Sequence, residues 1–407
     1  MAYLVNRIGY NDDRTIDSFG RGRVTSPSTL LDAMFQYNAK PLQFVTSLTG
    51  SGTVAKTANE SSLTLTCTTA SGDLALIQSK EYVRYQPGKS QLIFMTGFIG
   101  AAKANVVQQI GYMDNNDGMF FQMQSTGASV VTRTSTSGSP VDTAVAQASW
   151  NIDKMDGTGV SGITIDFTKT QIFVIDLQWL GVGRVRFGFN VAGLTYYCHQ
   201  VTNANTLTSP YSNSGCLPVR WRITNTGTAA TNTTMKAICC SVQSEGGLEL
   251  IPGLPFAASN GVTSISVSTR RPILSIQPAA TFNSIVNRTQ TIVDEVKVLT
   301  SSGTVYWELV LNGALTGSSF AAVDATNSAT TFDVAATAIS GGVTVLSGYS
   351  SGGGDTARGQ GNASLLGAVS PLVNGFAGSA GDILSVVATA FTGSVNTNAV
   401  LNFHELR

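Results

Sequence analysis

Pairs of carboxylates are the residues of this sequence best suited to acid–base chemistry, and they stand at Asp12 and Asp13, Asp114 and Asp117, and Asp153 and Asp156. Two carboxylates about 5–10 Å apart can cleave a glycosidic bond, with one acting as acid and the other as base or nucleophile. The second pair, however, lies in the turn-like segment DNNDG, and the third precedes glycines. Asp is common at such positions because it hydrogen-bonds the backbone. We therefore predict turn residues here and keep glycan cleavage as an alternative.

Metal and nucleophile sites find little support in the sequence. The segment 153–159 offers carboxylates and glycine carbonyls to a Ca²⁺ ion, but it does not match a complete calcium loop. The two histidines are His199 and His404, and only His199 has a cysteine beside it, Cys198. Neighbouring side chains on a strand point to opposite faces, so these two cannot share a zinc ion. We predict no enzyme and no catalytic, cofactor-binding or metal site.

The glycines of residues 181–188 (GVGRVRFG) suggest a dinucleotide-binding loop. Arg186 occupies the place of the third glycine of that motif, however, and no helical pattern follows. A strand explains the segment better, with Arg184 and Arg186 on one face and Val185 and Phe187 on the other.

Composition limits the classes of function. The chain has 407 residues, 24 basic and 24 acidic, and only 12% of it is charged, against about 25% in an average protein. A nucleic-acid coat needs clustered Lys and Arg, so nucleic acid is not an expected partner. Hydrophobic residues make up 43% of the chain, which is enough for sizeable cores. A surface rich in Ser, Thr, Asn and Gly in place of charge favours a protein of a large assembly.

Targeting patterns are weak in this sequence. Charge interrupts the first residues from Arg7 onward, and no run of about 18 apolar residues occurs, so we expect neither a signal peptide nor a membrane partner. The number of cysteines is odd and none forms a C-x-x-C pair, which predicts free thiols in a reducing compartment. They are Cys67, Cys198, Cys216, Cys239 and Cys240.

The pattern of the chain predicts two β domains after an arm. Residues 1–50 are irregular and predict an extended N-terminal arm with one short helix over 28–36. Residues 51–247 predict a large antiparallel β-sandwich or jelly roll, because short β-branched runs alternate with turns about every ten residues. A Gly/Pro-rich linker is expected over 248–264, and a second, smaller β-sandwich over 265–407.

The predicted strands follow from period-two alternation and from turn residues at their ends. In the first domain they are 61–68, 91–99, 105–112, 128–134, 171–180, 182–192, 194–201, 218–225 and 234–243. In the second they are 265–269, 273–277, 292–300, 304–311, 335–347, 383–392 and 395–406. Residues 301–407 hold only eight charged residues, so we expect the outward face of this module to contact something other than bulk solvent.

Three stretches carry a family resemblance. Residues 17–27 (DSFGRGRVTSP) resemble an opening DAFGRLRVSxP, residues 85–91 (YQPGKSQ) a segment YQPGKS, and residues 178–186 (QWLGVGRVR) a segment WLGVGRVR. In this order and spacing, they resemble uncharacterised virion structural proteins of tailed bacteriophages. The resemblance covers about residues 15–250, and the sequence departs from the opening at Ser18 and Gly22.

The resemblance implies a non-enzymatic structural component of the phage particle, assembled in the bacterial host cytoplasm and located in the virion. We expect it to act through homo-oligomeric interfaces and contacts with other virion proteins, at the tail, baseplate or fibre attachment. The alternative is a head-surface decoration or head-fibre protein. A further alternative is a glycan-binding or glycan-cleaving receptor protein with a host surface glycan as partner, and its candidate stacking residues are Tyr82, Tyr85, Tyr196 and Tyr197.

Overall fold

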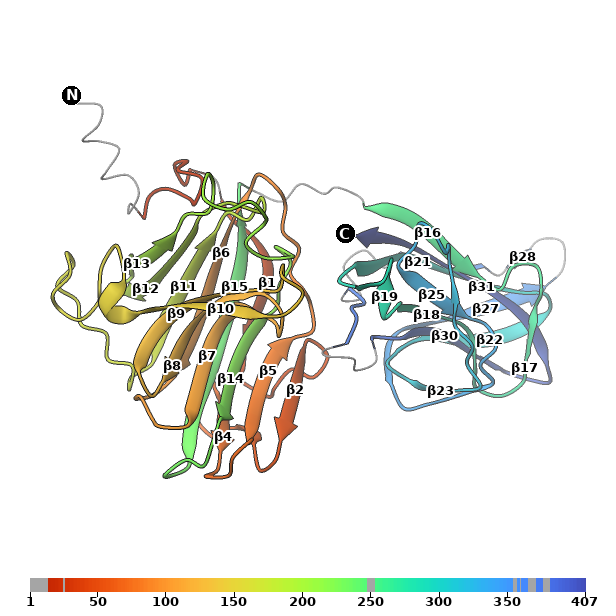
Figure 1. Ribbon diagram of the computed structural model, residues 1–407. Helices are drawn as coiled ribbons and strands as arrows, with labels where there is room; N and C mark the ends of the chain where they lie inside the picture. The colour runs from red at the N-terminus through yellow and green to blue at the C-terminus, as the bar shows by residue number, and fades with distance from the viewer. Residues whose placement is uncertain are drawn as a thin grey trace. The chain divides into compact units, whose positions relative to one another are not determined.

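The computed structural model describes residues 14–24, 26–246, 253–353, 357–358, 360–364, 371–375 and 381–407. The chain divides into two compact units, Met1–Glu249 and Leu250–Arg407 (Figure 1). Across the described ranges the secondary structure is β, apart from a single 3₁₀ turn at Gln147–Ser149. The all-β class with two sandwich units, expected from the sequence, is confirmed. None of the described residues forms a helix long and apolar enough to cross a membrane.

The first unit consists of two antiparallel sheets. The first sheet has the order β13-β12-β11-β6-β15-β4-β3, and β1 also pairs with β15. Its strands are β1 (Ser28–Met34), β3 (Thr53–Lys56), β4 (Leu63–Cys67), β6 (Ser90–Phe98), β11 (Gln171–Leu177), β12 (Val185–Val191), β13 (Leu194–Val201) and β15 (Thr233–Glu245).

The second sheet of this unit has the order β10-β9-β8-β7-β14-β5-β2. Its strands are β2 (Phe44–Thr49), β5 (Leu74–Ser79), β7 (Val106–Met113), β8 (Gly118–Gln124), β9 (Gly127–Thr134), β10 (Val141–Ala146) and β14 (Val219–Asn225). The DNNDG segment forms the β7–β8 hairpin turn, as the sequence predicts.

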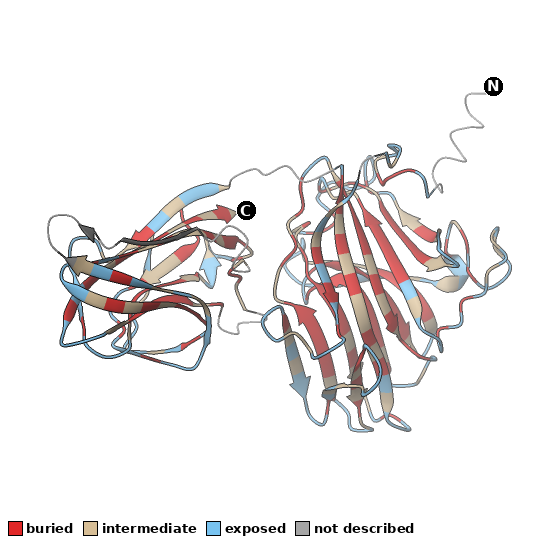
Figure 2. Ribbon diagram, turned by 180° about the vertical axis from the view of Figure 1, so that it is seen from behind, coloured by how far each residue is buried: buried red, intermediate tan, exposed pale blue. Residues whose placement is uncertain are grey.

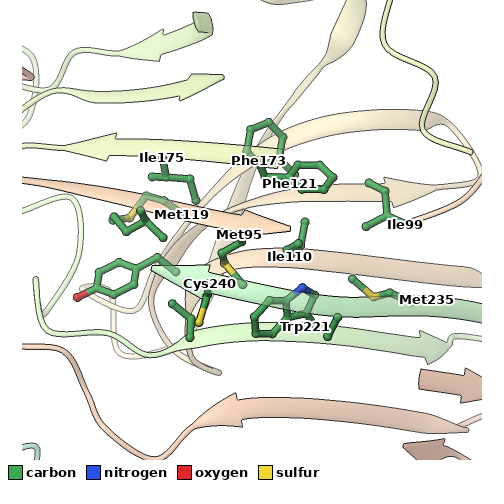
Figure 3. Packing of buried hydrophobic residues seen from close by; sticks show 14 of the residues in the cluster. Met95, Ile99, Ile110, Met119, Phe121, Phe173, Ile175, Trp221, Met235 and Cys240 are labelled. Atoms are coloured by element: carbon green, nitrogen blue, oxygen red, sulfur yellow. The ribbon is translucent and has the colours of Figure 1, made fainter. Parts of the chain in front are cut away.

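The core of the first unit lies between these two sheets because strand alternation turns one side chain in two inward. In Figure 2, buried and less buried residues accordingly alternate along many strands. Phe121 of the second sheet meets Phe173 of the first at the centre of this core, where Met95 and Trp221 also pack (Figure 3). Val185 and Phe187 belong to the same core, as predicted from the 181–188 segment.

The arm predicted over residues 1–50 is shorter in the structure, and its second half is part of the sandwich. Strand β1 pairs with β15 and β2 pairs with β5, so the helix predicted over 28–36 is wrong. The burial of Leu31, Ala33 and Phe35 follows a period of two, and Phe35 packs against Trp221. The free edge of β15 supplies partners that override the weak helical pattern. Residues 1–13 of the predicted arm lie outside the described residues.

The second unit is also a sandwich of two antiparallel sheets. One has the order β16-β31-β21-β29 with β17 paired to β31, and the other the order β24-β25-β18-β30-β22-β27-β28. The strands of the first are β16 (Leu254–Ser259), β17 (Ile265–Val267), β21 (Gln290–Thr300), β29 (Gln360–Ser364) and β31 (Val395–Leu406). Those of the second are β18 (Arg271–Pro278), β22 (Gly303–Leu311), β24 (Ala321–Ala322), β25 (Thr330–Asp333), β27 (Val343–Gly353), β28 (Ala357–Arg358) and β30 (Leu384–Ala390).

Two short ribbons complete this unit, namely β19 (Thr281–Phe282) with β20 (Ile285–Val286), and β23 (Ala314–Thr316) with β26 (Ala338–Ser340). The single strand predicted over 335–347 is divided between β26 and β27. The linker predicted over 248–264 is also only partly a linker, since β16 lies within it and pairs with the C-terminal strand β31. Proline at 255 is tolerated because β16 is an edge strand of its sheet.

Removing the Phe187 ring should destabilise the first unit. The side chain has no exposed surface and meets Phe121 edge-on at 5.5 Å between ring centroids. We expect Phe187→Ala to lower the free energy of unfolding by about 3–5 kcal/mol, through lost burial and the cavity left behind. Chemical denaturation followed by tryptophan fluorescence measures it, and Val141→Ala, at an exposed position of β10, is the control. A loss below about 1 kcal/mol would show that the register of β12 is wrong.

Candidate functional site

A buried charge cluster lies on the outer face of the first sheet, the face turned away from the core. Its centre is Asp176 of β11, which is directly opposite Arg186 of β12 and has no exposed surface. The neighbours of Asp176 along the strand, Ile175 and Leu177, belong to the core, so alternation turns the carboxylate outward. The segment 14–24 lies against this face through its contacts with Asp176, Arg184 and Arg186.

The carboxylate of Asp176 accepts hydrogen bonds from five side chains. Its Oδ1 accepts from the hydroxyls of Ser18 at 2.5 Å and Ser90 at 3.0 Å. Its Oδ2 accepts from Arg186 at 2.5 Å, Arg23 at 2.6 Å and the Tyr197 hydroxyl at 2.7 Å. Because two of these donors are cations, the buried negative charge is compensated by partners in direct contact.

Arg23 connects Asp176 to a second carboxylate. Its Nε lies 2.7 Å from Glu245, near the end of β15, and its Nη1 donates to the carbonyl of Arg14. Arg23 therefore joins two strands of the sheet, β11 and β15, to the N-terminal segment. On the other side of the cluster, Arg186 stacks on the ring of Tyr197 with 4.0 Å between its Cζ and the ring centroid.

The N-terminal segment folds into a tight turn that presents its carbonyls to the sheet. Asp17 Oδ1 accepts from the backbone amides of Phe19 and Arg21, and Gly20 has φ +79°, which suits glycine. Arg184 donates to the carbonyls of Asp17 and Ser18, and Arg186 donates to that of Ile16. Arg186 of β12 and Arg184, which directly precedes this strand, thus hold successive carbonyls of the turn.

The second family-like segment, residues 85–91, closes the same site. Arg21 donates to the carbonyl of Gly88, while the Ser90 hydroxyl accepts from the backbone amide of Ser18. The ring of Tyr85 packs edge-on against Trp179 at 5.9 Å between centroids. The segments 17–27, 85–91 and 178–186, far apart in the sequence, therefore meet around one cluster.

The electrostatics of the cluster depend on burial and on the two arginines. Burial alone would raise the pKa of Asp176, but Arg186 and Arg23 outweigh it, so the pKa lies below its ordinary value. Burial and then the negative charge of Asp176 raise the pKa of Tyr197 far above normal, which keeps its hydroxyl a donor. Burial, followed by repulsion from Asp176, raises the pKa of Glu245 to about 7, although Arg23 opposes the shift.

This arrangement is suited to holding a chain segment and not to turning over a substrate. Both carboxylate oxygens of Asp176 already accept from at least two donors. No lone pair is therefore free to accept a proton from a substrate. The chemistry that the cluster performs is attachment of residues 14–24 to the sheet.

The carboxylates proposed for acid–base work serve turns. Asp114 accepts from the amides of Asn116 and Asp117, and Asp117 accepts from the amides of Ser135 and Asn213. These bonds join the β7–β8 hairpin turn to two neighbouring loops. Asp12 and Asp13 lie outside the described residues.

The 153–159 loop is also held by backbone contacts. Asp153 accepts from the amides of Met155 and Ser161, while Asp156 accepts from the amide and hydroxyl of Thr158. A Cβ at Gly159 would come within 1.9 Å of the Asp153 carboxylate, so a larger residue here would displace that side chain from its hydrogen bonds. Within the described parts of the chain, no three His, Cys, Asp or Glu side chains gather as metal ligands would.

The cysteine, histidine and tyrosine candidates are separated by the fold. Cys198 is buried in the core, whereas the ring of His199 accepts from the amide of Asn151. Burial lowers the pKa of His199, so its ring is neutral near neutral pH. Of the tyrosines considered for stacking on sugars, Tyr82, Tyr85 and Tyr197 are buried and only Tyr196 is partly exposed.

Sequence reasoning found the arginines of this site but missed its centre. Asp176 is the single charge within the apolar strand 172–177, and an isolated carboxylate there must be paired when the strand is buried. That pattern was available in the sequence. Tyr197 and Glu245 gave no comparable pattern, because their contacts depend on the order of strands in the sheet.

No protein-family model and no curated protein matches this chain. Among solved structures, it is similar to a glycosyl hydrolase family 16 protein of Mycobacterium smegmatis, with 11% identity, a TM-score of 0.35, and coverage of 53% of this chain and 100% of that one. A legume lectin-like domain of Entamoeba histolytica has 11% identity and a TM-score of 0.32, covering 54% and 98%. A Shewanella oneidensis protein of unknown function has 8% identity and a TM-score of 0.35, covering 60% and 94%. At these values the likeness says nothing about activity or ligand.

Neutralising the centre of the cluster should cost much of the stability of the first unit. Asp176→Asn keeps the shape of the side chain but removes the negative charge that Arg186 and Arg23 share, so Arg23 retains only Glu245 as its counter-charge. We expect a loss of about 3–5 kcal/mol in the free energy of unfolding, measured by chemical denaturation. Lys236→Ala removes the exposed ion pair with Glu60 and should cost much less stability, because water screens a pair of this kind. Equal effects of the two changes would show that water screens the cluster.

Glu245 should make the first unit less stable as the pH rises. Its folded-state pKa, about 7, exceeds that of an ordinary glutamate, so its contribution is full below the ordinary pKa and is lost as pH rises through 7. We expect Glu245→Gln to remove this loss, so the variant gains stability relative to the parent by up to about 3 kcal/mol between roughly pH 5 and pH 8. Denaturation curves across that range measure the difference. A difference in unfolding free energy between variant and parent that stays constant with pH would contradict the raised pKa of Glu245.

Proposed function

We propose that this chain is a non-enzymatic structural component of a tailed bacteriophage particle, where it acts through interfaces with its own copies and with other particle proteins. The observation that carries the proposal is the convergence of the three family-like segments on the Asp176 cluster. All three contribute backbone or side-chain contacts to one attachment, and the charged groups of its centre are paired with each other.

The physical argument concerns the role of residues 14–24. A segment held by buried charges keeps a fixed course on the sheet. The position of Arg14, the first residue of this segment, is therefore fixed as well. Particle proteins form repeated interfaces, which require surfaces that do not shift between copies. The low charge of the chain supports the same proposal, since like-charge repulsion between copies is small. Within the particle, we favour a tail, baseplate or fibre-attachment position over a head-surface one.

The proposal is tested in particles made from a phage genome that encodes this chain. Quantitative mass spectrometry of purified particles should find the protein in stoichiometric amount. Asp176→Asn, introduced into the genome, should reduce its incorporation severalfold because residues 14–24 lose their attachment, whereas Lys236→Ala should not. Absence of the parent protein from intact particles would overturn the proposal, and so would hydrolysis of host polysaccharide by the purified protein.

A further inference from the structure

Three aromatic side chains form an exposed patch on the second unit. They are Tyr306 of β22, Tyr349 of β27 and Phe391, which follows β30, and we call them the aromatic patch. Tyr349 and Phe391 are 66% and 61% exposed. The ring of Tyr349 lies between the other two, with centroids 5.5 Å from Tyr306 and 5.8 Å from Phe391.

Strand register builds this patch. Tyr306 and Tyr349 are direct cross-strand partners, and the amide of Phe391 donates to the carbonyl of Thr304. Val305 and Trp307 flank Tyr306 in the strand and are buried in the core, so alternation turns Tyr306 outward. A Cβ at Gly348 would come within 2.6 Å of Trp307, so the inward position next to Tyr349 admits only glycine without rearrangement.

The remainder of the same face shows that apolar side chains there are normally covered. Val310 and Val387 point to this face, and Ile339 of the β23–β26 ribbon buries them in a small cluster. No described residue covers Tyr349 or Phe391 in this way, as their exposure shows. A contiguous aromatic surface left open to solvent is characteristic of a binding site.

The surroundings of the patch are neutral and rich in hydroxyl groups. The nearby Glu308 carboxylate is paired with Arg270 and accepts from the Thr344 hydroxyl. Between residues 301 and 406 the sequence contains one Lys or Arg, Arg358, whereas a polyanion requires clustered cations. These features disfavour nucleic acid and acidic polysaccharide as ligands.

The hydroxyl groups complete the chemistry of the site. Thr304 and Ser351 form a cross-strand pair beside the two tyrosines, and their hydroxyls are hydrogen-bonded at 3.2 Å. Within the described ranges, no protein group is hydrogen-bonded to the phenol hydroxyl of Tyr306 or Tyr349. The patch therefore combines apolar ring faces with donors and acceptors at their edges, as ligand sites commonly do.

We propose that the aromatic patch binds a neutral glycan chain. A pyranose ring has an apolar C–H face and a rim of hydroxyls, which match the ring faces and the hydroxyl edge of the patch. The rings of Tyr306 and Phe391 are tilted from that of Tyr349 by 50° and 54°, so the patch presents ring faces in more than one direction to a sugar chain. The site goes beyond the proposed structural role and does not depend on it.

The full-length chain tests the proposal directly. Cellohexaose, mannohexaose, chitohexaose and maltohexaose serve as neutral probes, and a heparin hexasaccharide serves as the charged one, in calorimetry and saturation-transfer NMR. We expect at least one neutral probe to bind, and Tyr349→Ala and Phe391→Ala to weaken it by roughly tenfold or more. Tyr37→Ala removes an aromatic ring that is 84% exposed in the first unit and should leave affinity unchanged.

Three outcomes would overturn the proposal. They are failure of every neutral probe to bind, equal binding by parent and patch variants, and self-association of the parent that Tyr349→Ala abolishes in sedimentation. The last outcome would assign the patch to a protein interface. Because both substituted side chains are exposed, thermal unfolding of the variants should match that of the parent. A patch variant that no longer binds glycan should still be incorporated into particles. The proposal of a glycan site and the proposal of a structural role can therefore be refuted independently.

Discussion

A fully buried carboxylate needs compensating charge, and this requirement organises the first unit around Asp176. Arg186 supplies part of the charge from the neighbouring strand, but Arg23 supplies the rest from the N-terminal segment. Separating that segment from the sheet would leave the carboxylate and Glu245 without one of their cations. The attachment is therefore part of the folded state of the sheet and not an addition to it.

The surface of the protein carries little charge. Only 12% of the residues are charged, and several of those charges are inside the Asp176 cluster. The remaining surface relies on hydroxyl, amide and backbone groups for its polarity. Such a surface repels its own copies weakly, which is compatible with the proposed role in a particle, and it provides a neutral setting for the exposed rings of the second unit.

Strand alternation explains both the cores and the aromatic patch. It turns Phe187 into the core of the first unit and Asp176 outward, and in the second unit it turns Trp307 inward and Tyr306 outward. The two units differ in whether other residues cover the outward side chains of the sheet. In the first unit the residues 14–24 bury the outward groups, whereas Tyr349 remains open to solvent.

The sequence by itself determined the β class, many strands, and the facing of Arg184 and Arg186 relative to Phe187, because period-two alternation is a local property. It also indicated that Asp114 and Asp117, and Asp153 and Asp156, are turn residues. The helix that the local pattern predicts over residues 28–36 is wrong, since the edge of β15 with which they pair lies some two hundred residues away in the chain. The tertiary structure alone decided that Asp176, Arg23 and Glu245 meet, because contacts between distant segments depend on strand order, which no local pattern encodes.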